Sequence, residues 1–346
     1  MSTATEPTLK VGVMSFAHTH AIGYVSILQA RDDVELRVSD PRPSDSPGVE
    51  TRGRELAQQL GADYAETYEE LLAWGPDAVV VCSENVHHRA DVELAAAAGA
   101  HVLCEKPLAT EVEDARAMIE ACERAGVELM TAYPVRFSPM VDAISATLDA
   151  GRLGEVVGIT GTNNGKIPLS HRSWFTDPAL SGGGSIVDHT VHVADLLDLL
   201  LDARATTVHC AANQILHADD PRVGAETGGL VTVTFDDGVV ATIDCSWSVP
   251  RTAPTWGGLT LEVLGTAGSA HVDPFAPHVG GMDAADGTGI HLGFGVNADA
   301  LMVEEFLGAI REGRRPQPDA QVGLRTLQIV KAAQESARTG EPVAIG

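Results

Sequence analysis

Residues 101–109 read HVLCEKPLA: a short apolar run, then a charged pair, then a proline. Proline disfavours helical dihedral angles in the residue before it. Lys106 is therefore expected at the end of a strand, 101–104, and not inside a helix. A lysine in such a position is suited to stabilising negative charge during a reaction, and the neighbouring elements decide what surrounds it.

Short apolar runs alternate with helical patterns on both sides of that stretch. The apolar runs are nearly continuous, which is typical of strands buried on both faces of a parallel sheet. We therefore predict an α/β chain that begins with a Rossmann-like, doubly wound dinucleotide-binding domain, residues 1–132. Strands are expected at 9–14, 34–40, 78–82, 101–104 and 127–132, with helices at 51–60, 66–73, 88–98 and 110–125.

The pattern changes after Tyr133, where β-rich stretches predominate. Asp237-Gly238 between two such stretches indicates a hairpin turn, because glycine readily adopts a positive φ. We predict a C-terminal α+β domain, residues 133–346, with a large, mostly antiparallel open sheet, and a surface loop at 274–297. Strands are expected at 155–162, 206–215, 229–235, 239–246, 259–264 and 269–272, and helices at 139–151, after 184 and within 298–337.

Composition excludes several classes of partner. The formal net charge of −25 disfavours nucleic acid and anionic membranes, because phosphate groups require basic patches. The five cysteines are scattered without a C-x-x-C pair, which indicates free thiols in a reducing compartment. No apolar run is long enough to span a bilayer, and the N-terminus lacks a secretory pattern. We therefore expect a cytoplasmic protein.

The turn after the first strand is where a dinucleotide-binding domain carries G-x-G-x-x-G. Here residues 15–20 read SFAHTH, so Ser15, Ala17 and His20 occupy the three glycine positions. Serine and alanine are small enough for a modified phosphate-binding turn, whereas histidine should disturb the packing of helix on strand. His18 or His20, when protonated, could add positive charge for a pyrophosphate.

Asp40 ends the second strand, where a carboxylate binds the adenosine ribose in NAD-linked domains. An aspartate before Pro41 can equally be a turn former, and both interpretations remain open. We expect NAD to be preferred over NADP, since Asp40 would repel a 2′-phosphate and Pro41 restricts the approach of Arg42.

A second informative stretch is GGGSIVDHTVHVAD, residues 182–195. It predicts a helix in which Asp188, His192 and Asp195 have i, i+4 and i+7 spacing and so share one face. Imidazole titrates near neutral pH and is suited to accept a proton from a hydroxyl group.

Together these motifs resemble the Gfo/Idh/MocA family, the group of glucose–fructose oxidoreductase and inositol dehydrogenase. The resemblance also covers 81–88, Arg136-Phe137-Ser138-Pro139 and the segment 174–178. It implies an NAD(P)-binding N-terminal domain and a C-terminal domain whose open sheet serves substrate contact and assembly into a homodimer or homotetramer. It also implies redox chemistry at a hydroxyl of a carbohydrate or cyclitol.

The resemblance implies residue roles as well. Lys106, Asp188 and His192 are the expected catalytic residues. The expected cofactor contacts are Ser15, Phe16, Ala17, His18, Asp40, Ser83, Asn85, His88, Glu105 and Lys106. The expected substrate contacts are Lys106, Arg136, Trp174, His189 and His192.

Two other readings stay open. The same fold could carry a redox-neutral lyase or glycosidase that uses tightly held NAD or a metal ion. A nucleotide-sensing or scaffold protein without turnover is disfavoured, because Lys106, Asp188 and His192 are all present. Histidines accumulate at His18, His20, His189 and His192, yet we expect no metal site, since no second carboxylate–histidine set has ligand spacing.

Overall fold

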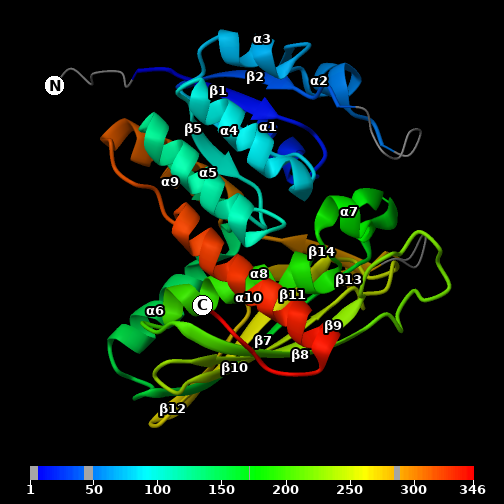
Figure 1. Cartoon of the computed structure of the whole chain (residues 1–346), viewed down its shortest axis with the longest axis vertical. Helices are drawn as coiled ribbons and strands as arrows, with labels where there is room; N and C mark the ends of the chain where they lie inside the picture. Colours follow the sequence, from blue (N-terminus) through cyan, green and yellow to red (C-terminus); the bar gives the residue numbers. More distant parts are fainter. Residues whose placement is uncertain (1–6, 43–49, 171, 284–288) are drawn as a thin grey trace. The chain divides into compact units, whose positions relative to one another are not determined.

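The structure, a computed structural model, describes residues 7–42, 50–170, 172–283 and 289–346. The chain forms two compact units (Figure 1). Unit 1 comprises Met1–Ala132, Ser170–Trp174 and Met302–Leu324, and unit 2 comprises the remainder. The division between residues 132 and 133 lies where the sequence pattern changes, but the two later segments belong to unit 1 and not to a continuous second domain.

Unit 1 is built on a sheet that has six strands in the described part of the chain, in the order β3-β2-β1-β4-β5-β6. Every pairing between them is parallel. The strand order reverses between β1 and β4, which confirms the predicted doubly wound sheet with its switch point beside β1. The strands are β1 (Leu9–Met14), β2 (Val34–Ser39), β3 (Asp63–Tyr64), β4 (Ala78–Val81), β5 (His101–Cys104) and β6 (Leu129–Thr131).

The helices of unit 1 follow the predicted alternation. α4 and α5 pack against each other, and α1 packs on β2. Thr67 caps one helix by accepting a hydrogen bond from the N–H of Glu70, and Gly126 ends another in a left-handed conformation. The helices are α1 (His20–Gln29), α2 (Gly53–Leu60), α3 (Tyr68–Ala73), α4 (His88–Ala97) and α5 (Val112–Ala125).

The segment Met302–Leu324 joins unit 1 through hydrogen bonds to the parallel sheet and its loops. Arg311 lies in α9 (Ala298–Glu312), and its Nη2 is 2.6 Å from Oδ2 of Asp33. The N–H of Thr131 donates to the carbonyl of Pro318 at 3.1 Å. These contacts are long-range in sequence, so the alternation of strands and helices could not reveal them.

Unit 2 contains a sheet of seven strands among the described residues, in the order β12-β11-β7-β10-β9-β8-β15. Only β7 and β10 pair in parallel; the other pairings are antiparallel, as predicted. Gly238 turns the β9–β10 hairpin with a φ of 91°. The strands are β7 (Val156–Gly165), β8 (Ala205–Asn213), β9 (Gly228–Phe235), β10 (Val240–Ser246), β11 (Gly257–Gly265), β12 (Gly268–Val272) and β15 (Val343–Ala344).

One face of this sheet is covered by α8 (Ser185–Leu200), which packs on β7, β9 and β10 (Figure 1). Side chains alternate along β9, so Val231 and Val233 are buried whereas Leu230 is exposed. The predicted helices at either end of the unit are α6 (Pro139–Asp149) and α10 (Ala320–Thr339), and α7 (Pro178–Ser181) is a single short turn.

The prediction of a surface loop at 274–297 is wrong. This segment contains an antiparallel pair of strands, β13 (His278–Met282) and β14 (Gly289–Gly293). The side chains of β13 are exposed, so burial imposes no alternation of polar and apolar residues that the sequence could show. The rest of the expected loop, 284–288, lies outside the described residues. Among the helices described, none has both the length and the apolar character needed to cross a bilayer.

Candidate functional site

The first turn of unit 1 keeps a tight conformation without glycine. Ser15 has a φ of 74°, in the left-handed region where glycine is the usual residue. Its N–H donates to the carbonyl of Ser39 at 2.8 Å, and its Oγ accepts from the N–H of Ala17 at 3.1 Å. Phe16 and Ala17 are buried beneath this turn. The turn therefore leads from β1 into α1 much as a glycine-rich turn would.

Asp40 lies beside that turn, and both of its carboxylate oxygens accept hydrogen bonds. The hydroxyl of Ser15 donates to Oδ1, and the N–H of Gly53 donates to Oδ2 at 2.9 Å. The guanidinium of Arg52 adds two bonds, from Nη2 to Oδ1 at 2.7 Å and from Nε to Oδ2 at 3.1 Å. Both carboxylate oxygens thus have two donors, so Asp40 organises the turn, and a ribose hydroxyl could bind it only by displacing one of them.

Arg52 also holds a second carboxylate. Its Nη1 donates to Oε1 of Glu84 at 2.7 Å. Burial alone would lower the pKa of Arg52, but the hydrogen bonds with Asp40 and the charge of Glu84 hold the pKa above its ordinary value. Arg42 does not take part, since its guanidinium binds Asp91 at 2.5 and 2.7 Å.

Three of the expected cofactor contacts follow β4, namely Ser83, Asn85 and His88. Ser83 and Asn85 are buried at the carboxyl end of this strand, which is where ligands bind in doubly wound sheets. Ser83 Oγ has no hydrogen-bond partner within the described ranges.

The ring of His88 lies in the interior and bonds two backbone carbonyls, and its contact with the cofactor stays a prediction. The ring is fully buried, with Nε2 3.1 Å from the carbonyl oxygen of Ser83 and Nδ1 3.0 Å from that of Pro107. Burial lowers the pKa of His88. The ring therefore fastens the turn after β4 to the turn after β5.

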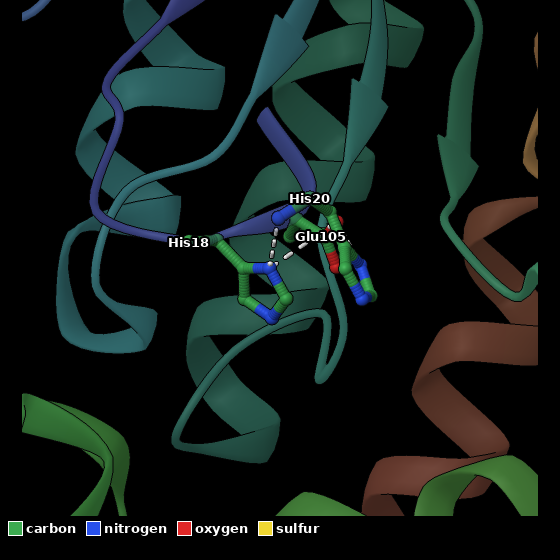
Figure 2. Close-up of side chains that lie close together, drawn as sticks. All are labelled: His18, His20 and Glu105. Atoms are coloured by element: carbon green, nitrogen blue, oxygen red, sulfur yellow. Dashed lines mark hydrogen bonds and ion pairs between the residues drawn. The ribbon is translucent and has the colours of Figure 1, made fainter. Parts of the chain in front are cut away.

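Glu105 and Lys106 follow β5 and are both buried. Glu105 Oε1 accepts from the hydroxyl of Tyr24 at 2.8 Å and lies 2.9 Å from Nδ1 of His20 and 3.8 Å from Nδ1 of His18 (Figure 2). Burial acts to raise the pKa of Glu105, but the charges of His18, His20 and Lys106 outweigh it and the pKa is lowered.

Side chains of His18, His20 and Glu105 offer metal ligands. One ligand atom from each residue lies within 4.8 Å of the others. The two rings are tilted by 59° with centroids 4.2 Å apart.

Trp174 also belongs to this unit, and its contact with substrate stays a prediction. Its indole N–H donates to the carbonyl of Ala17 at 3.0 Å, and its ring meets that of His18 edge-on with centroids 6.4 Å apart. The side chain is buried. Trp174 therefore supports the first turn.

In unit 2, three glycines let α8 begin against a neighbouring loop. A Cβ on Gly184 would lie 2.0 Å from the carbonyl oxygen of Glu226. The carboxylate of Glu226 accepts from the N–H groups of Gly184 at 2.8 Å and Ile186 at 3.3 Å, which satisfies free donors at the helix start. Burial raises the pKa of Glu226.

Asp188 lies in the first turn of α8 and remains partly accessible. The indole N–H of Trp247 donates to Asp188 Oδ2 at 3.1 Å, and Nε2 of His189 is also 3.1 Å from that oxygen. His189 Nδ1 lies 2.7 Å from the carbonyl oxygen of Asn163. Trp247, which the sequence did not single out, therefore orients the carboxylate.

His192 is one turn further along α8 and is also partly accessible. Its ring packs edge-on against Tyr133, with centroids 6.2 Å apart. The hydroxyl groups of Tyr133 and Thr326 are 2.7 Å apart. Carboxylate and imidazole thus occupy one accessible helix face, the arrangement required for proton transfer.

Arg136, an expected substrate contact, has its guanidinium in an ion pair with Asp195. It lies in the short helix η2 (Pro134–Phe137), buried against Asp195, with Nε 3.1 Å from both carboxylate oxygens and Nη2 2.5 Å from Oδ1. Burial raises the pKa of Asp195 to about 6 despite the positive charge of Arg136. This ion pair fixes η2 on α8, and contact of Arg136 with substrate stays a prediction.

Two family models match the chain. Residues 38–133 match the oxidoreductase family with an NAD-binding Rossmann fold, and residues 141–271 match the GFO/IDH/MocA C-terminal domain.

Known proteins match over most of the length. A D-xylose 1-dehydrogenase (NADP(+)) of Haloferax volcanii is 30% identical over 94% of this chain and 97% of its own. A D-apiose dehydrogenase of Paraburkholderia graminis is 28% identical over 86% of this chain and 77% of its own. The solved structure of GenD2 from gentamicin A biosynthesis, in complex with NAD, has a TM-score of 0.84 at 24% identity, covering 100% of this chain and 99% of that one. This structural match supports the fold alone.

Proposed function

This chain is an oxidoreductase of the Gfo/Idh/MocA family, and we propose that it transfers hydride between NAD(H) and a hydroxyl-bearing carbon of a sugar, sugar acid or cyclitol. The names of the two dehydrogenases described above specify sugars, D-xylose and D-apiose. This supports a carbohydrate substrate for the present chain. The observation that carries the proposal is the occurrence, in a chain of this family, of Lys106 after β5 together with Asp188 and His192 on an accessible face of α8.

The residues of unit 1 fit a dinucleotide. The left-handed Ser15 brings the N-terminus of α1 to the carboxyl edge of the sheet, where N–H groups can receive a pyrophosphate. Ser83 supplies a buried hydroxyl without a partner in the described structure, at the same edge. Bound NAD supplies the hydride acceptor or donor.

Lys106 and His192 carry the proton chemistry in this proposal. The ammonium group of Lys106 stabilises negative charge that develops on the substrate oxygen. His192 takes the hydroxyl proton as general base, and Asp188, held by the indole of Trp247, orients the reacting group. The Arg136–Asp195 ion pair is a positioning device that fixes the turn of α8 on which His192 lies.

NAD is the preferred nucleotide in this proposal. Two carboxylates, Asp40 and Glu84, share the single guanidinium of Arg52, which leaves one negative charge in excess beside the first turn. A 2′-phosphate would bring further negative charge to this group.

Net oxidation is favoured over the lyase or glycosidase alternative, because the two relatives described above, which each match most of the chain, are named as dehydrogenases. The test is incubation with NAD⁺ and a panel of aldoses, sugar acids and cyclitols while reduced nicotinamide is measured. Formation of NADH in proportion to product supports the proposal. Consumption of a substrate at unchanged nicotinamide would favour the redox-neutral alternative.

The open face of the unit 2 sheet is our proposed surface for a homodimer or homotetramer. Leu230, Val157 and Leu264 are each about half exposed there, at 54%, 50% and 54%. Apolar side chains gathered on one sheet face are typical of subunit interfaces. We also propose a cytoplasmic location, which the five free, buried cysteines of the described structure support.

A further inference from the structure

We propose that His18, His20 and Glu105 form a binding site for one divalent transition-metal ion, with Zn²⁺ as the best fit. The sequence led us to expect no metal site, because no second carboxylate–histidine set has ligand spacing. The fold supplies that carboxylate from a residue 85 positions away, at the end of β5. This inference does not depend on hydride transfer.

The distances agree with a metal centre. Zinc lies about 2.0–2.2 Å from histidine nitrogen and carboxylate oxygen, so two ligands at tetrahedral angles are about 3.3–3.6 Å apart. Glu105 Oε1 is 2.9 Å from Nδ1 of His20 and 3.8 Å from Nδ1 of His18. These two distances lie on either side of that range, and one ligand atom from each residue lies within 4.8 Å of the others, so rotation of the side chains can bring all three atoms around one ion.

Neighbouring groups form hydrogen bonds to Glu105 and to the backbone of His18, as groups around metal ligands usually do. The hydroxyl of Tyr24 donates to Glu105 Oε1 at 2.8 Å, and the N–H of Lys106 donates to Oε2 at 3.1 Å. Such outer hydrogen bonds orient a ligating carboxylate. The backbone of His18 is fixed by its N–H bond to the carbonyl of Cys82 at 2.9 Å.

Access and ligand chemistry point to the class of ion. His18 and Glu105 are buried, but the His20 side chain is 36% exposed, so an ion can reach the cluster from solvent at this residue. Two imidazoles and one carboxylate suit Zn²⁺ and similar ions, whereas Mg²⁺ and Ca²⁺ prefer oxygen ligands. In the structure the Nδ1 lone pair of His18 accepts a hydrogen bond from the N–H of His20 at 3.2 Å. A bound metal ion would replace this hydrogen bond at Nδ1.

Calorimetry on the full-length protein, stripped with a chelator and titrated with ZnCl₂ alone, tests the site. We expect one ion per chain. His20→Ala and Glu105→Gln should each weaken binding by at least about tenfold, and Tyr24→Phe should weaken it by about 10- to 100-fold while retaining the ring. Circular dichroism would show which variants fold, and Tyr24→Phe keeps the test available if the others do not.

The matched control is His278→Ala. The rings of His278 and His291 stack with centroids 4.1 Å apart in the β13–β14 hairpin. They are a second histidine pair that could compete for zinc. Zinc affinity unchanged by His278→Ala and reduced by the cluster variants supports the proposal. Failure to bind stoichiometric zinc, equal affinity in folded Tyr24→Phe, or loss of binding only in His278→Ala would overturn it.

Discussion

The guanidinium of Arg52 and the carboxylate of Asp40 form a two-point ion pair, with Nη2 2.7 Å from Oδ1 and Nε 3.1 Å from Oδ2. Both side chains are almost wholly buried, and Glu84 shares the same guanidinium. This pair joins the end of β2 to the start of α2, so the shape of the nucleotide end of unit 1 depends on it.

Removing this guanidinium should destabilise the protein. Arg52→Ala leaves two buried carboxylates without a counter-charge, and we expect a loss of about 3–5 kcal/mol in the free energy of unfolding. Urea denaturation measures it. The control is Arg54→Ala, which removes a half-exposed arginine paired with Glu66 and should cost about 1 kcal/mol or less. Equal losses in both variants would contradict the account.

The same charges predict nucleotide preference. Because one negative charge remains in excess around Arg52, NAD⁺ should bind at least about tenfold more tightly than NADP⁺, a difference of about 1.4 kcal/mol. Calorimetric titration of the same preparation with both nucleotides provides the comparison. Tighter binding of NADP⁺ would show that the guanidinium, and not the carboxylates, faces the ribose.

In the proposed mechanism, turnover should depend on Lys106 and on His192. Lys106→Ala and His192→Ala should each lower kcat by about two orders of magnitude, because one stabilises developing charge and the other accepts a proton. His209→Ala, an exposed histidine on β8, is the control and should leave kcat unchanged. If either active-site variant folds and keeps near-normal turnover, that residue has no part in the mechanism.

The raised pKa of Glu226 should make the free energy of unfolding depend on pH. Burial raises its pKa above the ordinary 4.5, so the folded state holds the proton more tightly than the unfolded state. The free energy of unfolding should therefore fall as pH rises from 4.5 through the raised pKa. Glu226→Gln keeps an acceptor for Gly184 but cannot titrate, so its stability should lack this decline. Equal pH profiles in urea denaturation would refute the assignment.

Features that depend on neighbouring residues were predicted well from the sequence. Proline constrains the residue before it, and this placed Lys106 after a strand, as the structure has it. Helical spacing placed Asp188 and His192 on one face of α8, because that relation spans only four residues. The doubly wound parallel sheet of unit 1 was predicted from the alternation of strands and helices, and the structure adds its strand order.

Features that depend on distant partners were not predicted. The ion pair of Arg136 with Asp195 spans 59 residues, and only burial reveals that the two charges need each other. Glu105 meets His20 across 85 residues, so the possible metal ligands could not be recognised from spacing. His88 and Trp174 each bond to backbone carbonyls in the interior, which their sequence positions did not indicate.

The fate of one hydrogen atom tests the central claim most directly. A substrate found in the carbohydrate panel, carrying deuterium on the reacting carbon, would be incubated with the enzyme and NAD⁺, and both products would be analysed by mass spectrometry. We predict that the deuterium moves to the nicotinamide ring and that the other product is the carbonyl compound. Deuterium released to water, or kept in a product of unchanged oxidation state while NAD⁺ remains oxidised, would contradict an NAD-linked dehydrogenase.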